Sequence, residues 1–358
     1  MQRTACLVLA SVVALVAVGA AACGETPCDP TAEACTLDAK ISTITVPAGH
    51  EDEDTCQSWT LNNPTELWVS GITQHNDGAY HHANWFFVPD DEFAVPDGAW
   101  SCSQLKFSEV GAALLGGYLF AMSTQSREEH QDLPAGNAIR IPPYSRVIGA
   151  SHLLNAGDSN VTSTMRVSIR TIPPSEVRGK LAPGRITYED LHLDPQASSS
   201  FTTECMIADE YERIMKQPVQ YKLVYTLSHY HSLGVYTELS LVGGPHDGEI
   251  VMHHDGYGEN AGVAIDPPVD LGALGARGLR LTCGFQNPRT AAVGWGIGDQ
   301  EMCVMALQAI TDLGWDGAVG HGDGRKVGVA GDGEVQYKGP CGMLSFVWNF
   351  NKAGGPPR

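Results

Sequence analysis

The chain has 358 residues, of which 43% are hydrophobic, a proportion typical of globular proteins that bury a core. Its 41 acidic and 22 basic residues give a formal net charge of -19, which repels polyanions and supplies no basic stripe for a phosphate backbone. Composition and charge therefore exclude a largely disordered chain and a nucleic-acid-binding protein.

The first 22 residues have the pattern of an export signal, with Arg3 ahead of an apolar stretch over 5–22. The ending Gly-Ala-Ala-Ala-Cys resembles a bacterial lipoprotein cleavage site, which predicts Cys23 as the lipidated first residue of the mature protein. A spanning helix is the alternative, but small residues crowd the end of the stretch and a polar tether, 23–38, follows it. We expect an exported protein of the bacterial cell envelope, in the periplasm or on the outer membrane surface, with Cys23 as its membrane anchor.

After the tether, short β-rich runs alternate with clusters of Gly, Pro, Asn and Asp, which is the pattern of an all-β protein. One helix is predicted in the first half, over 109–115. The strands predicted there are 41–46, 67–72, 85–88, 146–150 and 165–172. The strands predicted in the second half are 219–228, 236–242, 249–253, 278–285, 302–310 and 343–350.

A Pro-rich connection, 173–183, separates the two halves. We predict two tandem jelly-roll-like β-sandwich domains, 39–172 and 184–350, followed by a tail, 351–358. The 40 glycines and 21 prolines favour many turns and few long helices, and so favour sandwiches over a parallel α/β sheet. The Gly-rich stretch 314–333 is interpreted as an insertion.

Eight cysteines remain after Cys6 in the signal and Cys23 at its end, and an even number in an exported chain indicates disulfides. Because none forms a Cys-x-x-Cys pair, a zinc ribbon or a thioredoxin-like site has little support. The sequence leaves the connectivity open, although Cys28 with Cys35 would close a small loop within the tether. The other six are Cys56, Cys102, Cys205, Cys283, Cys303 and Cys341.

Three motifs carry side chains suited to a metal. His229 and His231 end a β-rich run, and residues two apart on a strand point to one face, so both imidazoles can meet one ion; the alternative is a pair of solvated surface histidines. His81 and His82 are adjacent, so joint binding would need a bend, a bulge or different ring nitrogens. Met302 lies between an acidic turn and Cys303, where a core methionine is the alternative.

Together, these motifs resemble the copper type II, ascorbate-dependent monooxygenases, the family that includes peptidylglycine α-hydroxylating monooxygenase and dopamine β-monooxygenase. The resemblance spans nearly the whole mature chain and is most specific over 299–303 (Asp-Gln-Glu-Met-Cys) and 229–234 (His-Tyr-His-Ser-Leu-Gly). A looser match, Leu-Pro-Ala-Gly over 133–136, precedes His152. The resemblance implies an enzyme that hydroxylates an activated C–H bond of a small substrate with O2.

The same resemblance implies two separated coppers in each chain. An electron-transferring copper would bind His81, His82 and His152, and the oxygen-binding copper of the catalytic site would bind His229, His231 and Met302. Imidazoles support both Cu(I) and Cu(II), whereas a thioether favours Cu(I). Ascorbate or another one-electron donor would supply the electrons. We expect a monomer whose partners are a small-molecule substrate and O2.

The family pattern also implies the disulfides Cys205 with Cys341 and Cys283 with Cys303, the second of which would anchor Met302. Cys56 and Cys102 are left as a residual pair. The peptidylglycine enzymes bind a substrate carboxylate through an arginine, an asparagine and a tyrosine, and the corresponding positions here are Leu227, Val304 and Ala306. A peptide carboxylate is therefore not the expected substrate.

Two other classes of protein stay open: an exported copper-binding or copper-delivery protein without turnover, and a lectin-like surface sandwich that binds no copper. The remaining histidines are weaker candidates for metal binding. His253 and His254 follow a strand and are given a low weight. The others are interpreted as solvated loop residues: His75, His130, His246 and His321.

Overall fold

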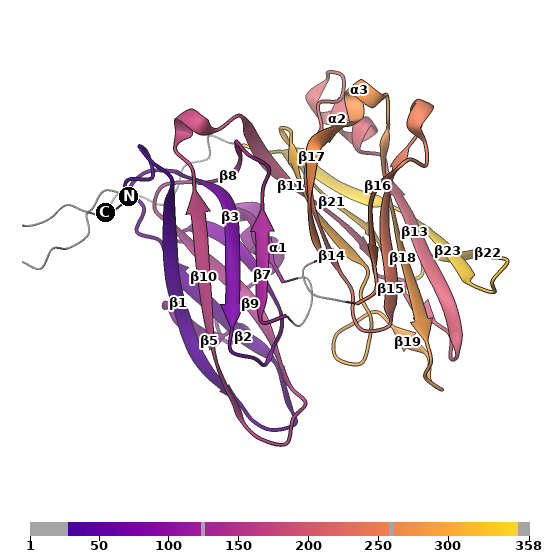
Figure 1. The fold of residues 1–358 in the computed structure, drawn as a ribbon, viewed down its shortest axis with the longest axis horizontal. Coiled ribbons are helices and arrows are strands. Elements are labelled where there is room, and N and C mark those ends of the chain that lie inside the picture. Colours follow the sequence, from indigo (N-terminus) through magenta and orange to yellow (C-terminus); the bar gives the residue numbers. More distant parts are fainter. Residues whose placement is uncertain (1–27, 123–125, 258–260, 350–358) are drawn as a thin grey trace, which may run out of the picture.

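The computed structural model of the chain describes residues 28–122, 126–257 and 261–349, and it confirms the all-β fold class. The strands form two β-sandwiches that lie side by side, the first from the earlier part of the chain and the second from the later part (Figure 1). The predicted export signal and Cys23 lie outside the described residues. Within those residues, no helix is both long and apolar enough to cross a membrane.

The first sandwich packs β1, β10, β3 and β8, which pair in this order, against a sheet with the order β5, β2, β9, β4, β6. Side chains from both sheets, such as Ile72, Trp85 and Val147, fill the core between them. Its elements are β1 (Cys35–Val46), β2 (His50–Thr60), β3 (Leu67–Asn76), β4 (Tyr80–Pro89), β5 (Gly98–Ser101), α1 (Glu109–Leu115), β6 (Gly117–Ala121), β7 (Glu128–Asp132), β8 (Asn137–Ile141), β9 (Ser145–Asn155) and β10 (Val161–Thr171).

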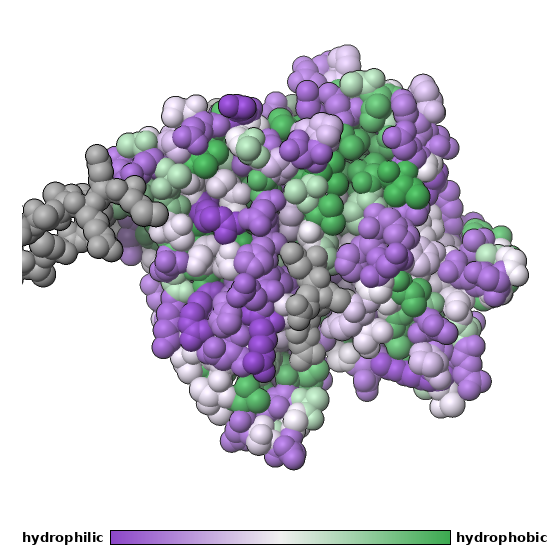
Figure 2. All heavy atoms as spheres, viewed as in Figure 1, coloured by the Kyte–Doolittle hydropathy of each residue, from purple (hydrophilic) through white to green (hydrophobic). Residues whose placement is uncertain are grey.

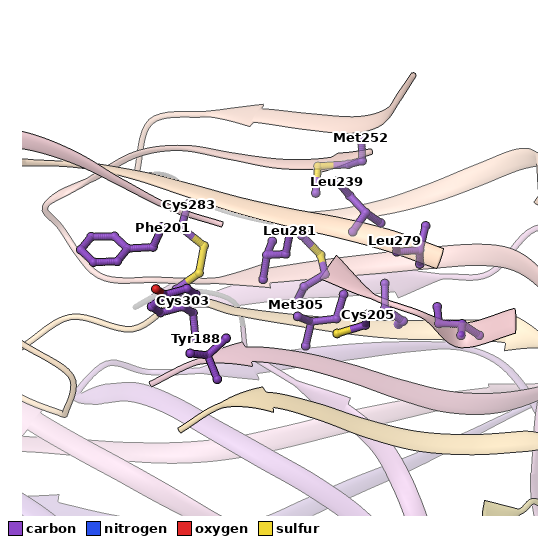
Figure 3. Close-up of a cluster of buried hydrophobic side chains, with 14 of the residues drawn as sticks. Tyr188, Phe201, Cys205, Leu239, Met252, Leu279, Leu281, Cys283, Cys303 and Met305 are labelled. Carbon is purple, nitrogen blue, oxygen red and sulfur yellow. A yellow bond between two sulfur atoms is a disulfide. The ribbon is translucent and has the colours of Figure 1, made fainter. Parts of the chain in front are cut away.

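The second sandwich packs a sheet with the order β16, β15, β18, β13, β23, β22 against β11, β20, β14 and β17. Figure 3 shows part of the core between them, where Phe201, Leu281 and Met305 lie near the disulfide Cys283–Cys303. The elements after β10 are η1 (Pro174–Glu176), β11 (Gly179–Tyr188), β12 (His192–Leu193), β13 (Ala197–Cys205), α2 (Ile207–Met215), β14 (Lys222–His229), β15 (Gly234–Val242), η2 (Gly244–His246), β16 (Ile250–Asp255), β17 (Gly262–Asp270), α3 (Leu271–Leu274), β18 (Gly278–Asn287), β19 (Val293–Gly294), β20 (Val304–Ile310), β21 (Leu313–Val319), β22 (Arg325–Val329), β23 (Val335–Pro340) and β24 (Gly342–Val347).

The two sandwiches are joined through backbone pairing and apolar packing. β8 pairs in parallel with β11, so one sheet continues from the first sandwich into the second. Val224, Tyr225 and Leu227 of β14 also belong to the core cluster of the first sandwich. β11 begins at Gly179, inside the predicted connection 173–183, because the chain enters this shared sheet before the Pro-rich segment ends. The interface places β14 beside the sheet that carries β4 and β9.

The helix predicted over 109–115 is present as α1, and the Oγ of Ser108 caps it by accepting a hydrogen bond from the N–H of Gly111 at 3.1 Å. Two further helices, α2 and α3, were not predicted. α2 spans only 9 residues, so its apolar positions Ile207 and Tyr211 repeat too few times to give a helical period.

Much of the stretch 314–333, interpreted as an insertion, forms the strands β21 and β22. β21 pairs with both β11 and β24, and its glycines permit close approach. A Cβ at Gly317 would lie only 2.6 Å from the Sγ of Cys341. Glycine there lets the strand pass the disulfide.

All four predicted disulfides are present: Cys28–Cys35, Cys56–Cys102, Cys205–Cys341 and Cys283–Cys303. Their number indicates an exported protein, because disulfides persist in oxidising compartments.

Most of the face in Figure 2 is hydrophilic, with apolar side chains gathered over the upper part of the second sandwich, near β17.

Candidate metal centre

Two adjacent histidines of β4 are brought to one site by an irregularity in the strand. The pairing of β4 with β9 shifts register between Tyr80 and His82, and His82 then lies opposite His152. On a regular strand, His81 and His82 would face opposite ways, whereas one extra residue turns them together. A bend or bulge was one of the arrangements expected from the sequence, beside binding through different ring nitrogens. The register shift gathers the three histidines that were predicted to form one ligand set.

His229 is the last residue of β14, and His231 follows two residues later. Their ring centroids are 5.3 Å apart. The position of His231 is fixed by the turn before Met302, since its Nδ1 lies 2.8 Å from the carbonyl oxygen of Gln300 and its backbone N–H donates to the Glu301 carboxylate at 2.8 Å. The second predicted ligand set is therefore built on one supported turn.

The two sets form a single cluster across the interface between the sandwiches. The ring centroid of His81 lies 4.9 Å from that of His152 and 5.0 Å from that of His231. The ring centroid of His82 lies 5.0 Å from those of His152 and His229. The sequence argument expected two separated sites, and this structure instead places both sets in contact. The physical reason is the packing of β14 against the first sandwich, which chain order does not reveal.

Several ring nitrogens in the cluster are buried and lack a hydrogen-bond partner among the described residues: His82 Nε2, His152 Nδ1 and His231 Nε2. In two of these rings, the other nitrogen is engaged. His152 Nε2 lies 2.8 Å from the Glu51 carboxylate, and His231 Nδ1 donates to a carbonyl. In a metal-binding histidine, one ring nitrogen is held by such a partner and the other keeps a lone pair for the ion.

Burial and neighbouring rings favour the neutral form of two histidines of the cluster, His82 and His231. Burial lowers the pKa of His82 well below its usual 6.5, and the neighbouring imidazoles lower it further. Burial also lowers the pKa of His231, although its hydrogen bond to Gln300 opposes this effect. Neutral imidazole is the form that binds metal, so the cluster needs little proton loss before it can hold an ion.

The turn that carries Met302 is tied down on both sides. The Glu301 carboxylate accepts the backbone N–H groups of His231 and Leu233 at 2.8 Å each, and Cys303 is bonded to Cys283 of β18. Burial raises the pKa of Glu301 to about 7, and these backbone hydrogen bonds oppose the rise. Met302 is half-buried and lines a cavity together with His82 and His229.

That cavity has a volume of about 380 Å³ and is lined by residues of both sandwiches. The volume is within the range of small-molecule sites. The sequence-predicted residues that line it are His82, His229, Met302, Leu227, Val304 and Ala306. The histidine cluster therefore borders a space that could hold a ligand.

Sequence reasoning missed the residues that orient the cluster. Glu301 was part of a quoted motif but had no assigned role. Glu51 belongs to a short acidic run, and 101 residues separate it from His152, so no local spacing links the two. Glu51, Glu53 and His152 bring potential ligand atoms within 4.8 Å of one another, but both glutamates are exposed.

Several of the remaining histidines lie outside the cluster, beside acidic groups. His253 pairs with Asp255 at 2.9 Å, and His246 pairs with Glu249 at 2.7 Å. The interpretation of His75 and His130 as loop residues is wrong, because they lie on β3 and β7. Their side chains are exposed and both approach Glu128, at 3.4 and 3.0 Å. His321 is exposed in a turn.

The fold and the site define an exported, disulfide-bonded all-β protein with a histidine cluster between two sandwiches. No family model matches the chain, and no curated protein matches it. Solved structures similar to it include the Cowpea mosaic virus top component, with 9% identity, 76% of this chain and 89% of that chain covered, and a TM-score of 0.33. The Kashmir bee virus empty particle has 11% identity, 39% and 95% coverage, and a TM-score of 0.22. A triple jelly roll of an archaeal virus has 7% identity, 75% and 59% coverage, and a TM-score of 0.19. All three TM-scores are below 0.5, so these likenesses carry no argument about this chain.

Proposed function

We propose that the chain is a copper-dependent monooxygenase that hydroxylates an activated C–H bond of a small substrate. The overall reaction is R–H + O2 + 2 e⁻ + 2 H⁺ → R–OH + H2O, with ascorbate or another one-electron donor as the source of electrons. The observation that carries the proposal is the cluster of five imidazoles with buried ring nitrogens, beside a thioether and a cavity. Zinc and copper both accept imidazole, but a thioether favours Cu(I).

The number and type of donors fit two ions better than one. Five imidazoles and one thioether exceed the four donors of a tetrahedral site, and they divide by chain position into two sets of three. His81, His82 and His152 would hold one copper, and His229, His231 and Met302 the other. When bound, copper supplies the one-electron chemistry that O2 requires. In this structure the two sets adjoin, so the two sites would be neighbours in this arrangement of the sandwiches.

The residues around the ligands would orient them and exclude water. The Glu51 carboxylate accepts a hydrogen bond from Nε2 of His152, and the Gln300 carbonyl accepts one from Nδ1 of His231. Glu301 fixes the turn before Met302 through backbone hydrogen bonds. Such outer partners set the tautomer and direction of a metal-binding ring. We further propose export through residues 1–22, lipid anchoring of Cys23 in the cell envelope, and a monomeric state.

Oxygen consumption by the purified mature protein, reconstituted with Cu(II) and supplied with ascorbate, tests the proposal. A panel of small compounds is screened for substrate-dependent O2 uptake, and ¹⁸O2 is used to find label in the hydroxylated product. We expect both signals for at least one compound, their loss in Met302→Ala, and their retention in the exposed control His321→Ala. Copper uptake without substrate-dependent O2 use or ¹⁸O incorporation would instead indicate a copper-binding or copper-delivery protein.

A further inference from the structure

The wall of the cavity next to His229 is apolar because of the strand pairing that builds it. β14 and β20 are antiparallel, with Leu227 opposite Ala306 and His229 opposite Val304. Residues directly opposite each other share one face of a sheet, so these side chains lie together. All four line the cavity. A molecule that reaches His229 and Met302 would therefore contact hydrocarbon on this side.

The part of the lining that comes from the first sandwich is largely apolar as well. Phe86 of β4 and Met122 line it, and α1 contributes Val110 and Leu114. Val110 is 60% exposed and Leu114 is 51% exposed. Leu344 of β24, which also lines the cavity, is 58% exposed. Exposed apolar side chains from both sandwiches thus border the cavity, and exposed apolar patches commonly mark ligand-binding grooves.

Three of the four charged side chains of the lining, Glu109, Arg185 and Asp316, have hydrogen-bond partners. Arg185 makes two hydrogen bonds to Asp316, at 2.9 and 2.6 Å, so this guanidinium is already engaged. Glu109 accepts a hydrogen bond from the Asn84 side chain at 3.2 Å. Burial raises the pKa of Glu109, which favours its neutral form, while Asn84 and the charge of Arg185 oppose the rise. Glu189 is the remaining carboxylate of the lining. Among the lining residues that the structure describes, a ligand carboxylate would meet no uncommitted Lys or Arg.

We propose that this cavity binds a neutral hydrophobic molecule as its substrate, with a C–H bond presented to His229 and Met302. That this molecule is a substrate rests on the proposed function, whereas its binding rests on the residues that line the cavity. Burying a charged group in an apolar site is costly unless it is paired, so carboxylate and ammonium ligands of the same size should bind more weakly. The buried Thr187 Oγ1 lines the cavity without a hydrogen-bond partner among the described residues, and it could bond one neutral polar group.

Binding to the copper-free mature protein tests the inference without any turnover. The probes are butylbenzene, 3-phenylpropylammonium and 4-phenylbutanoate, which share a phenylalkyl body and differ in charge. Calorimetry or quenching of tryptophan fluorescence measures affinity, since Trp295 lines the cavity. We expect butylbenzene to bind about tenfold tighter than either ion. Equal or tighter binding of an ion, or no binding of butylbenzene, would overturn the inference.

A variant of the wall provides the specific control. Val304→Arg should lower the affinity for butylbenzene about tenfold and raise that for 4-phenylbutanoate, because it places a cation beside His229. Val329→Arg, on an exposed strand position outside the lining, should change neither affinity. If Val304→Arg fails to fold, Ala306→Arg replaces it. Unchanged ligand selectivity in a folded wall variant would overturn the inference.

Copper binding is measured on the same preparations, so the two proposals can fail separately. A protein that takes up no copper but prefers butylbenzene refutes the proposed function and retains a hydrophobic site. A protein that takes up copper but binds the ionic probes equally well refutes the neutral substrate and retains the metal centre.

Discussion

The Glu51 carboxylate lies 2.8 Å from Nε2 of His152, so an acidic side chain of β2 orients an imidazole on β9. The same carboxylate also lies close to the turn before Met302, since a Cβ at Gly298 would be 3.2 Å from Glu51 Oε1. Glu51 therefore contacts His152 of the first ligand set and lies near the turn that carries Met302 of the second.

Replacing Glu51 tests this orienting role. Glu51→Ala should weaken copper binding at the first ligand set about 10- to 100-fold, because His152 loses the partner that fixes its tautomer. Competition with a copper chelator measures the affinity. The control is Glu249→Ala, which removes an exposed carboxylate from a comparable pair with His246. Equal copper affinities in Glu51→Ala and the unmodified protein would contradict the role.

The two ligand sets are separable by substitution. Met302→Ala should abolish substrate-dependent O2 use while one copper stays bound, because the first set keeps its three imidazoles. In His152→Ala, the copper of the first ligand set should be released before the copper of the second set. Copper analysis during dialysis against a weak chelator measures both effects. Retention of two coppers and full activity in either variant would show that the residue is not a ligand.

The disulfide beside Met302 is predicted to support both folding and copper binding. Its two cysteines are 20 residues apart, so a chain-entropy model gives a contribution of about 3 kcal/mol to the free energy of unfolding. The double variant Cys283→Ala, Cys303→Ala should lose this stability and bind the second copper more weakly. Urea unfolding and copper titration measure the two effects. Removing Cys28–Cys35 in the same way should leave copper binding intact, and equal copper loss in both would refute a local role.

The stability of the chain should depend on pH through Glu109. Burial raises the pKa of this carboxyl above its usual 4.5, against the effects of Asn84 and Arg185. Protonation therefore favours the folded state, and this contribution is complete below pH about 4.5 and is lost as the pH rises through the folded-state pKa. Glu109→Gln should raise Tm at pH 7 and leave it unchanged near pH 4. Thermal unfolding of the variant and the unmodified protein at both pH values measures the two Tm differences. Equal Tm values at pH 7 would contradict the prediction.

The sequence predicted the all-β class, helix α1 and all four disulfides, because these follow from local patterns, cysteine number and a family resemblance. It did not predict β21 and β22, because their glycines resemble loop residues. Gly317 is glycine for packing against Cys341, and only tertiary contact shows this. Helix α2 was missed because two turns give little periodicity.

At the site, the histidines and Met302 could be chosen from sequence because each motif carries ligand chemistry. A bulge near His81 was one of the arrangements expected from strand geometry, and the register shift between Tyr80 and His82 matches it. The contact between His81 and His231 could not be predicted, since it depends on how two sandwiches pack. The role of Glu51 could not be predicted either, because its partner His152 is distant along the chain.

The copper content of the reconstituted protein shows whether the histidine cluster and Met302 form a two-copper site. Elemental analysis after removal of loosely bound metal, with X-ray absorption of the Cu(I) form, gives the number of coppers and their donors. We predict two coppers per chain, imidazole donors at both, and one sulfur donor that disappears in Met302→Ala. A protein that holds no copper, or holds it unchanged after His229→Ala and His82→Ala, would contradict the account.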